Sequence, residues 1–419
     1  MNRRSHELWG ALALLALAID GCAGAAPRAP DPSAAGGTPV AARPAAAPAA
    51  AGPTAPAAVP LAWPTGVPAL KDVFRGSFLI GASLDLEQIF GWDFRADTIV
   101  EYHYNTITPE NALKWERVHP ARDTYDFVPA DRYVAYGEKH GMFIVGHTLV
   151  WHAQVGQWVF EDGRGNPVGR DTLLARMRDH IFTVVGRYKG RIKGWDVVNE
   201  ALNEDGTLRA SPWLRLIGPD YIEKAFEYAH GADPSAELYY NDYSLENGPK
   251  RAGAVALIRK LRAEGVPVTG VGLQHHDRLD WPSVAQIDST IDAFASLGVK
   301  VMVTELDVNV LPAPRRYRGA DVSFSAESEA RLNPYTLGLP DSVQQALAQR
   351  YAELFAAFRR HSGVLTRVTF WNVTDRDSWL NDFPVRNRTA YPLLFDRTYR
   401  PKPAFYAVVR AAQAQVMGR

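Results

Sequence analysis

The stretch "IKGWDVVNE", residues 192 to 200, is an apolar run that ends on an amide and a carboxylate, Asn199 and Glu200. Its Ile, Trp and Val side chains favour a buried strand of the kind found in parallel sheets. Seven similar runs flank it along the chain, so that the eight predicted strands span residues 77–84, 105–111, 143–151, 192–200, 237–243, 268–276, 299–308 and 366–373.

Helix-like stretches separate these strands. They carry apolar residues at three- and four-residue spacing, as in residues 171–188, 218–230, 253–265 and 340–361. Strand and helix alternate eight times over about 350 residues, which predicts an α/β fold with one (β/α)₈ barrel, the TIM barrel. We place this single domain at residues 69–416. A doubly wound open sheet is the alternative, but the sequence has no glycine-rich nucleotide-binding loop.

The first 68 residues have a different composition. Residues 1–22 combine Arg3 and Arg4 with an apolar stretch and end at Cys22, which is the layout of a bacterial signal peptide of the lipoprotein type. Cleavage near "AGAA" (23–26) without lipidation is the alternative. Residues 23–68 are mostly Ala, Pro, Gly and Thr and predict a disordered tether. We therefore expect a secreted, periplasmic or outer-surface protein whose one membrane contact is a lipid on Cys22.

The composition favours a neutral partner. The chain has 46 basic and 46 acidic side chains, so no net field attracts nucleic acid or anionic lipid. The lone cysteine excludes a disulfide within the chain and a cysteine-based metal or redox site. Eleven tryptophans offer flat apolar faces of the kind on which sugar rings stack. We expect a monomer that needs no cofactor.

Reactive side chains gather at the carboxyl ends of the predicted strands, the face on which (β/α)₈ barrels build their sites. A single polar residue at a strand end is often only a cap or a solvated loop residue. Here nearly every strand repeats the pattern. The residues are Glu110, Asn111, Lys114, His147, Trp151, His152, Asn199, Glu200, Asn241, Asp242, Tyr243, Gln274, His275, His276, Glu305, Asp307, Trp371 and Asn372.

Two carboxylates stand out because each follows an apolar segment that must be buried: Glu200 after "GWDVVN" and Glu305 after "VMVT". Their strands lie across the mouth of an eight-stranded barrel from one another, so both groups can reach one substrate atom. Paired carboxylates with an amide neighbour and many tryptophans suit glycoside hydrolysis. A metal site with nearby histidines is the alternative. We predict no metal, because an HExxH spacing and a sufficient cluster of oxygen ligands are both missing.

Six segments resemble, in order, the signature segments of glycoside hydrolase family 10, the β-1,4-xylanases. They are "TPENALKWE" (108–116), "GHTLVWH" (146–152), "GWDVVNEAL" (194–202), "GVGLQHH" (270–276), "VMVTELDV" (301–308) and "WNVTDRDSWL" (371–380). The resemblance runs from about Gly81 to Phe405. It implies a (β/α)₈ barrel that cleaves internal xylan linkages with retention of anomeric configuration.

The resemblance also implies roles for individual residues. Glu200 becomes the general acid/base and Glu305 the nucleophile, while Asn199 donates to the sugar 2-hydroxyl. His276, supported by Asp307, is expected to hold Glu305 ionised. The residues expected around the sugar on the non-reducing side are Glu110, Asn111, Lys114, His147, Trp151, Gln274, Trp371 and Trp379, and those expected on the other side are Asn241 and Tyr243.

The sequence departs from the family pattern at a few positions. Asn372 stands where the family usually has Gly, Ser244 where it has Asn, and Leu380 where a basic residue is commoner. Residues 311–339 form an unusually long connection, which we interpret as a surface insertion, with a substrate-contacting segment as the alternative. Two other functions stay open: a retaining cellulase or mannanase, and a carbohydrate-binding protein without hydrolysis, which the two carboxylates disfavour.

Overall fold

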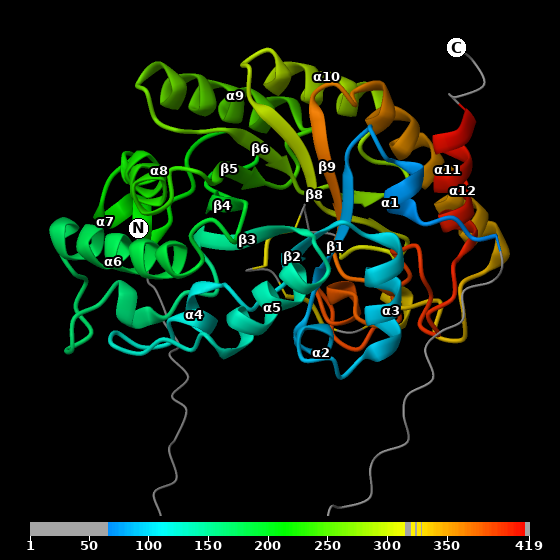
Figure 1. Ribbon diagram of the computed structural model, residues 1–419, viewed down its shortest axis with the longest axis horizontal. Helices are drawn as coiled ribbons and strands as arrows, with labels where there is room; N and C mark the ends of the chain where they lie inside the picture. Colours follow the sequence, from blue (N-terminus) through cyan, green and yellow to red (C-terminus); the bar gives the residue numbers. More distant parts are fainter. Residues whose placement is uncertain (1–65, 315–319, 323–324, 328, 415–419) are drawn as a thin grey trace, which may run out of the picture. The chain divides into compact units, whose positions relative to one another are not determined.

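The computed structural model describes residues 66–314, 320–322, 325–327 and 329–414. Its strands form one parallel sheet in the order β6-β5-β4-β3-β2-β1-β9-β8-β7, and a further pairing of β6 with β8 closes the sheet into a barrel (Figure 1). The strands are β1 (Leu79–Leu84), β2 (Thr106–Pro109), β3 (Phe143–Val150), β4 (Gly194–Asn199), β5 (Glu237–Asp242), β6 (Gly270–Leu273), β7 (His276–Arg278), β8 (Lys300–Asn309) and β9 (Leu365–Phe370).

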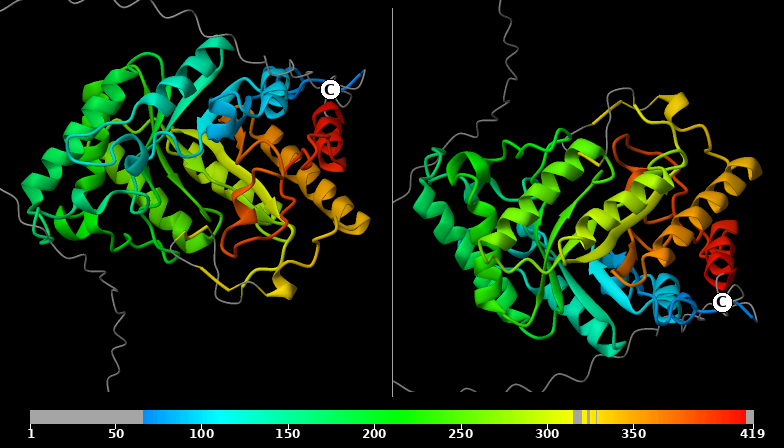
Figure 2. Two further views of the ribbon diagram at one scale, coloured as in Figure 1. Left: turned by 90° about the horizontal axis from the view of Figure 1, so that it is seen from below. Right: turned by 90° about the horizontal axis from the view of Figure 1, so that it is seen from above.

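A long helix follows each barrel strand, and these helices surround the strands (Figure 2). They are α3 (Phe94–His103), α5 (Val128–Lys139), α6 (Arg170–Arg187), α8 (Tyr221–Ala232), α9 (Gly248–Ala263), α10 (Val284–Ala295), α11 (Asp341–Arg360) and α12 (Pro403–Ala414). Shorter helices lie in the connections: α1 (Leu70–Val73), α2 (Leu86–Ile89), α4 (Trp115–Val118), α7 (Pro212–Leu216), η1 (Gln157–Val159), η2 (Ala330–Leu332) and η3 (Trp379–Asn381). The predicted (β/α)₈ barrel is confirmed.

The predicted strand at residues 268–276 is present as two pieces, β6 and β7. The break falls at Gln274 and His275, and His275 has a left-handed φ of 59°. Beyond the break, β7 continues along β8, with His276 beside Asp307. The two pieces therefore act as one barrel strand with a kink, which turns Gln274 and His276 toward the barrel mouth.

Close packing between strands and helices fixes the barrel. Gly146 in β3 leaves the space that the Trp195 ring of β4 fills, so that a Cβ atom at position 146 would collide with the indole. On the outside, the Tyr133 hydroxyl of α5 lies 2.8 Å from the main-chain oxygen of Ile107 and 2.7 Å from that of Val145, so that its one proton is shared between them. These contacts give a rigid frame for side chains at the strand ends.

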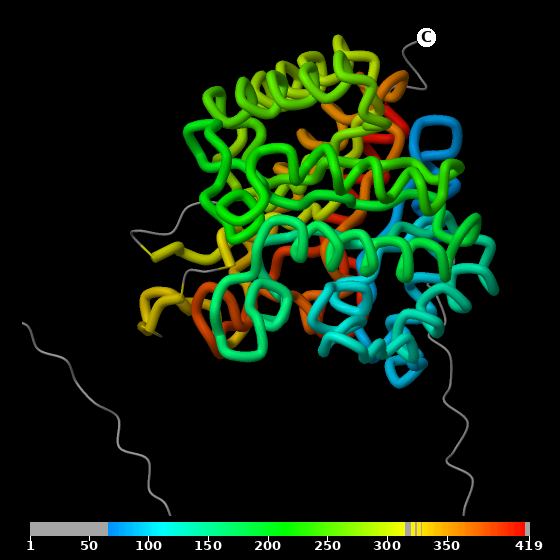
Figure 3. Tube along the Cα trace, turned by 90° about the vertical axis from the view of Figure 1, so that its left-hand side faces the viewer, coloured from blue at the N-terminus to red at the C-terminus, as the bar shows by residue number. Residues whose placement is uncertain are grey.

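The long connection between β8 and α11 packs onto the connection that follows β9. Ala326 pairs with Val385, and a small second core joins Leu311 to Leu380 and Ala390. Figure 3 shows the two connections side by side, in yellow and orange. The described part of residues 311–339 is thus anchored beside the barrel mouth. Its role, as a surface insertion or as a segment that contacts substrate, stays a prediction.

The predicted signal peptide, Cys22 and nearly all of the predicted tether lie outside the described residues. Within the described ranges, no helix is both long enough and apolar enough to cross a membrane.

Candidate active site

A pocket of about 180 Å³ opens at the carboxyl ends of the strands. It is lined by Glu110, Asn111, Lys114, His147, Trp151, Gln154, Asn199, Glu200, Gln274, His276, Glu305, Ala320, Val322, Trp371, Trp379 and Phe383. The pocket thus brings together every predicted catalytic, supporting and sugar-binding residue except Asp307, Asn241 and Tyr243. A larger cavity of about 610 Å³ lies at the amino ends of the strands, where Asp72 is the one carboxylate of its lining. That cavity lacks the paired acids.

Glu200 directly follows β4 and is buried, with 4% of its surface exposed. Its carboxylate accepts hydrogen bonds from Trp151 Nε1 at 2.8 Å and from Gln274 Nε2 at 3.1 Å. Asn199 Nδ2 lies 3.2 Å from the same carboxylate. Burial raises the pKa of Glu200 above its ordinary value of 4.5, although the two hydrogen bonds act in the opposite direction. Glu200 is therefore suited to hold a proton in the free enzyme.

Glu305 lies within β8 and is equally buried, with 5% of its surface exposed. Asn241 Nδ2 donates to its Oε1 atom at 2.7 Å, and His276 Nε2 lies 3.1 Å from its Oε2 atom. Burial alone would raise the pKa of Glu305, but the hydrogen bond with His276, the nearby His147 and His276 side chains and the hydrogen bond from Asn241 together outweigh burial and bring this pKa below 4.5. Glu305 is therefore suited to remain ionised.

A second carboxylate, Asp307, stabilises the positively charged form of His276. Its Nδ1 atom lies 3.1 Å from Asp307, which also accepts a hydrogen bond from Trp379 Nε1 at 2.7 Å. Burial disfavours the imidazolium, but Asp307 and Glu305 overcome this and raise the pKa of His276 to about 10. Asp307 therefore stands behind the pocket, where it supports His276.

Side-chain amides connect the two carboxyl groups. Asn241 Nδ2 donates to Asn199 Oδ1 at 2.9 Å as well as to Glu305. Gln274 Nε2 donates to Asn199 Oδ1 at 3.2 Å as well as to Glu200. Glu200 and Glu305 thus belong to one hydrogen-bonded network that holds both groups toward the same pocket.

A second set of polar groups lines the pocket beside the carboxyl pair. Lys114 Nζ donates to Asn111 Oδ1 at 3.0 Å and to Gln154 Oε1 at 2.8 Å, and it lies 5.1 Å from the Trp151 ring centre. Burial raises the pKa of Glu110 to about 7, although Lys114 opposes the change. These donors and acceptors, with the Trp371 and Trp379 indoles, match the hydroxyls and apolar faces of a neutral sugar.

Two residues expected to contact substrate lie elsewhere. Asn241 is fully buried and holds Glu305, so the expectation that it lines the far side of the pocket is wrong. Tyr243 is 3% exposed and its hydroxyl accepts a hydrogen bond from Arg209 at 2.7 Å. Its role in substrate binding stays a prediction.

The sequence did not single out four of the lining residues. Gln154 follows the "GHTLVWH" segment closely, so its position was a usable signal. Ala320 and Val322 belong to the 311–339 connection, for which a substrate-contacting segment was the alternative expectation. Phe383 carries no such signal, because only tertiary packing brings it to the pocket. Phe383 stacks on Trp379 with ring centres 5.0 Å apart.

The cleft continues beyond the pocket. Asn111 and Gln154 also line a second cavity of about 480 Å³, together with Asp85, Leu86, Glu87, Glu116 and Arg117. This open extension allows a chain longer than one sugar to lie along the barrel mouth.

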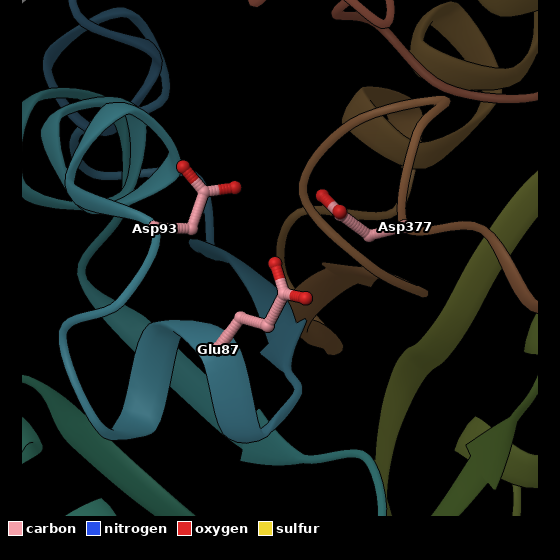
Figure 4. A group of neighbouring side chains, drawn as sticks. All are labelled: Glu87, Asp93 and Asp377. Atoms are coloured by element: carbon pink, nitrogen blue, oxygen red, sulfur yellow. The ribbon is translucent and has the colours of Figure 1, made fainter.

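Among the described residues, one group of three acidic side chains is close enough to share an ion: Glu87, Asp93 and Asp377 (Figure 4). Arg376 pairs with Glu87 and with Asp93, at 3.0 Å each. Burial raises the pKa of Asp377 to about 7, which favours its neutral form. Arg376 thus offsets part of the negative charge of this cluster within the protein, and we assign it no catalytic metal.

Comparisons with known proteins agree with this geometry. Residues 69–411 match the model of glycosyl hydrolase family 10. Endo-1,4-beta-xylanase A of Xylanibacter ruminicola is 43% identical over 343 residues, which cover 82% of this chain and 93% of that protein. The structure of an endoxylanase of the same family from a sugarcane soil metagenome has a TM-score of 0.79 and 43% identity, covering 81% of this chain and 99% of that one.

A xylanase of Thermoanaerobacterium saccharolyticum, solved as a variant in complex with xylotriose, is 38% identical, with a TM-score of 0.72. The alignment covers 82% of this chain and 99% of that one. The resemblance found in the sequence is confirmed, and the chain belongs to glycosyl hydrolase family 10.

Proposed function

We propose that this protein is a retaining endo-1,4-β-xylanase in which Glu200 is the general acid/base and Glu305 the nucleophile. One observation carries the assignment of roles: two buried carboxyl groups line one pocket, and only Glu305 is held by the imidazole of His276, whereas Glu200 is held by neutral donors. The pKa values of the two groups are accordingly shifted in opposite directions. A retaining glycosidase needs this asymmetry, because one carboxyl must donate a proton while the other attacks.

In the first step, the Glu305 carboxylate attacks the anomeric carbon of the sugar in the pocket. The bond from that carbon to the leaving oxygen breaks, and Glu200 gives its proton to this oxygen. Asn241 and His276 hold the nucleophile in place through the contacts that they make with its two oxygens. The product is a glycosyl ester of Glu305.

In the second step, Glu200 acts as a base. The ester oxygen of Glu305 no longer carries a negative charge, so repulsion between the two carboxyl groups is lost and the pKa of Glu200 falls. Glu200 then accepts a proton from water as the water oxygen attacks the anomeric carbon and releases Glu305. Each of the two steps inverts the configuration of the anomeric carbon, so the reaction as a whole retains it.

The substrate that we propose is the neutral backbone of xylan. Relatives at about 40% identity are named xylanases, and one related structure contains xylotriose. The pocket opens into a second cavity along the barrel mouth, and this continuity supports cleavage within a chain.

The test is to incubate the protein with xylan, carboxymethylcellulose and mannan and to analyse released oligosaccharides. Xylo-oligosaccharides should form from xylan, with a fall in viscosity that precedes most of the release of reducing ends. NMR should show the β anomer of the newly formed reducing ends before the α anomer. Glu305→Ala should remove activity. Equal rates on carboxymethylcellulose, or release of the α anomer first, would reject the proposal.

We also propose that the protein is exported and carries a lipid on Cys22, on the strength of the "AIDGC" segment. Labelled fatty acid should be incorporated into the protein in bacterial cells, and Cys22→Ser should lose the label and leave the membrane fraction. A labelled Cys22→Ser variant would contradict lipidation at this residue.

A further inference from the structure

Arg209 lies in the connection between β4 and α7 and contacts the main chain of Glu200. Its Nε atom donates to the Glu200 carbonyl oxygen at 3.1 Å, and Nη2 donates to the Tyr243 hydroxyl at 2.7 Å. Its side chain is 16% exposed. Arg209 does not line the catalytic pocket, so it acts on Glu200 from behind.

The main chain of Glu200 needs such support. Its φ is 56°, in the left-handed region, which costs a residue other than glycine about 1 kcal/mol. The Glu200 amide donates to Asn241 O at 2.9 Å, and the Glu200 carbonyl accepts from Arg209. The main-chain N–H and C=O of Glu200 are therefore both held by hydrogen bonds, and the left-handed turn aims the carboxyl group into the pocket.

Asp321 links Arg209 to the long connection after β8. Its Oδ2 atom lies 3.7 Å from Arg209 Nη1, and its neighbours Ala320 and Val322 line the pocket. Asp321 is itself outside the lining. This pair of opposite charges therefore sits beside Glu200, where either charge can be removed without loss of a residue that lines the pocket.

We propose that Arg209 is a positioning residue for Glu200: it fixes the left-handed main chain of the acid/base and, with Asp321, sets the electrostatic field at its carboxyl group. This inference rests on the acid/base role proposed above for Glu200. The guanidinium favours the ionised form of Glu200, which the second step requires. Asp321 partly offsets that charge.

Other groups also face Glu200 and remain in every variant discussed below. They are Lys114, His152, Asp242, Tyr243 and Glu305. His152 lies 3.9 Å from the Glu200 carboxylate, and burial lowers the pKa of His152 to about 4, so this imidazole is neutral across the working range. Because these groups are constant, a difference between variants reports on the changed residue.

The experiment compares the pH dependence of kcat/KM, on an aryl xylobioside, for the wild type, Arg209→Met and Asp321→Asn. The fall in kcat/KM at high pH, the alkaline limb, reports the pKa of the proton donor, Glu200. Without Arg209, ionisation of Glu200 is less favourable, so this limb should move up by about half a pH unit. Without Asp321, the limb should move down. In Arg209→Met, kcat on xylan should also fall about tenfold, because Glu200 is less well aimed.

Arg176→Met is the matched control. Like Arg209, Arg176 lies outside the pocket lining and binds main-chain oxygens, but these belong to Trp158, Val159 and Glu161 and not to Glu200. Its alkaline limb should stay in place. Arg209→Lys should return the alkaline limb to its wild-type pH but restore only part of kcat. Lysine keeps the positive charge but cannot reproduce the hydrogen bonds of the guanidinium.

The outcomes separate this inference from the proposed function. The positioning role would be overturned if the alkaline limb of kcat/KM stayed in place in both Arg209→Met and Asp321→Asn. It would also be overturned if the limb moved in the same direction in both variants. If Arg209→Met does not fold, the Asp321→Asn shift still decides the question, because Asp321 is a partly exposed residue. Full activity of Glu200→Ala on xylan would instead reject the acid/base assignment itself.

Discussion

At the scale of single residues, the site depends on left-handed backbone at the carboxyl ends of strands. Glu200, Ser244, His275 and Asn372 all have positive φ, between 53° and 81°. Such a residue turns the chain sharply as it leaves the barrel, which lets adjacent side chains point into the mouth. The strain is tolerated because neighbouring groups hold each turn, as the Ser83 hydroxyl does by accepting from the Asn372 amide at 2.7 Å.

Asn372 offers a direct test of this strain. Its φ of 81° lies in the left-handed region that favours glycine, and asparagine is among the other residues that tolerate this region best. Asn372→Ala should lower the free energy of unfolding by about 1 kcal/mol, whereas Asn372→Gly should be closer to wild type. Urea unfolding of the three proteins measures the difference. Equal losses for Ala and Gly would show that the Asn372 side chain, not the backbone, sets stability.

His276 tests the electrostatic support of the nucleophile. The imidazolium lowers the pKa of Glu305, so the acid limb of kcat/KM, which reports ionised Glu305, should move to higher pH in His276→Ala. The wild type should remain active down to pH values below about 4.5, the ordinary value for a glutamate. An acid limb that does not move in His276→Ala would mean that His147 and Asn241, and not His276, lower this pKa.

At the scale of elements, adjacent strands position the carboxyl pair. Asn241 comes from β5 and reaches Glu305 in β8 across Gly272 of β6, where a Cβ atom would collide with the Asn241 side chain. Gly272→Ala should therefore displace the amide from Glu305. We expect kcat to fall at least tenfold while the protein still folds at room temperature. Crystal structures and kcat of Gly272→Ala and of Asn241→Ala check this, and a Gly272→Ala enzyme of normal kcat would contradict it.

The sequence predicts the elements better than it predicts their contacts. All eight strands were identifiable because each is a short apolar run, and the positions of the polar residues followed from the barrel geometry. The kink at His275 was not visible, because a left-handed histidine has no reliable local signal. The function of Asn241 was also hidden: its type suited a sugar contact, and only the packing of β5 against β6 shows that it faces Glu305.

At the scale of the whole molecule, the start of the barrel domain is fixed by packing. Helix α1 brings Leu70 and Phe74, both fully buried, against the rest of the core. Phe74 stacks on Phe78 at 4.9 Å and contacts Phe355 of α11 at 5.2 Å. Just before α1, Val67 O accepts a hydrogen bond from the Tyr102 hydroxyl of α3 at 2.8 Å. The segment that enters the barrel thus ties α3 to α11.

This arrangement predicts where the chain can be shortened. A protein that starts at residue 66 should have the same kcat/KM on xylohexaose and the same unfolding free energy as the full chain, because it retains every described contact of the pocket and of α1. A protein that starts at residue 77 loses Leu70 and Phe74, each worth about 2 kcal/mol of buried apolar surface, so it should be several kcal/mol less stable. Thermal unfolding and the kinetics of both proteins decide the matter. If the shorter protein is as stable as the longer one, α1 does not belong to the folding unit, and the domain begins at β1.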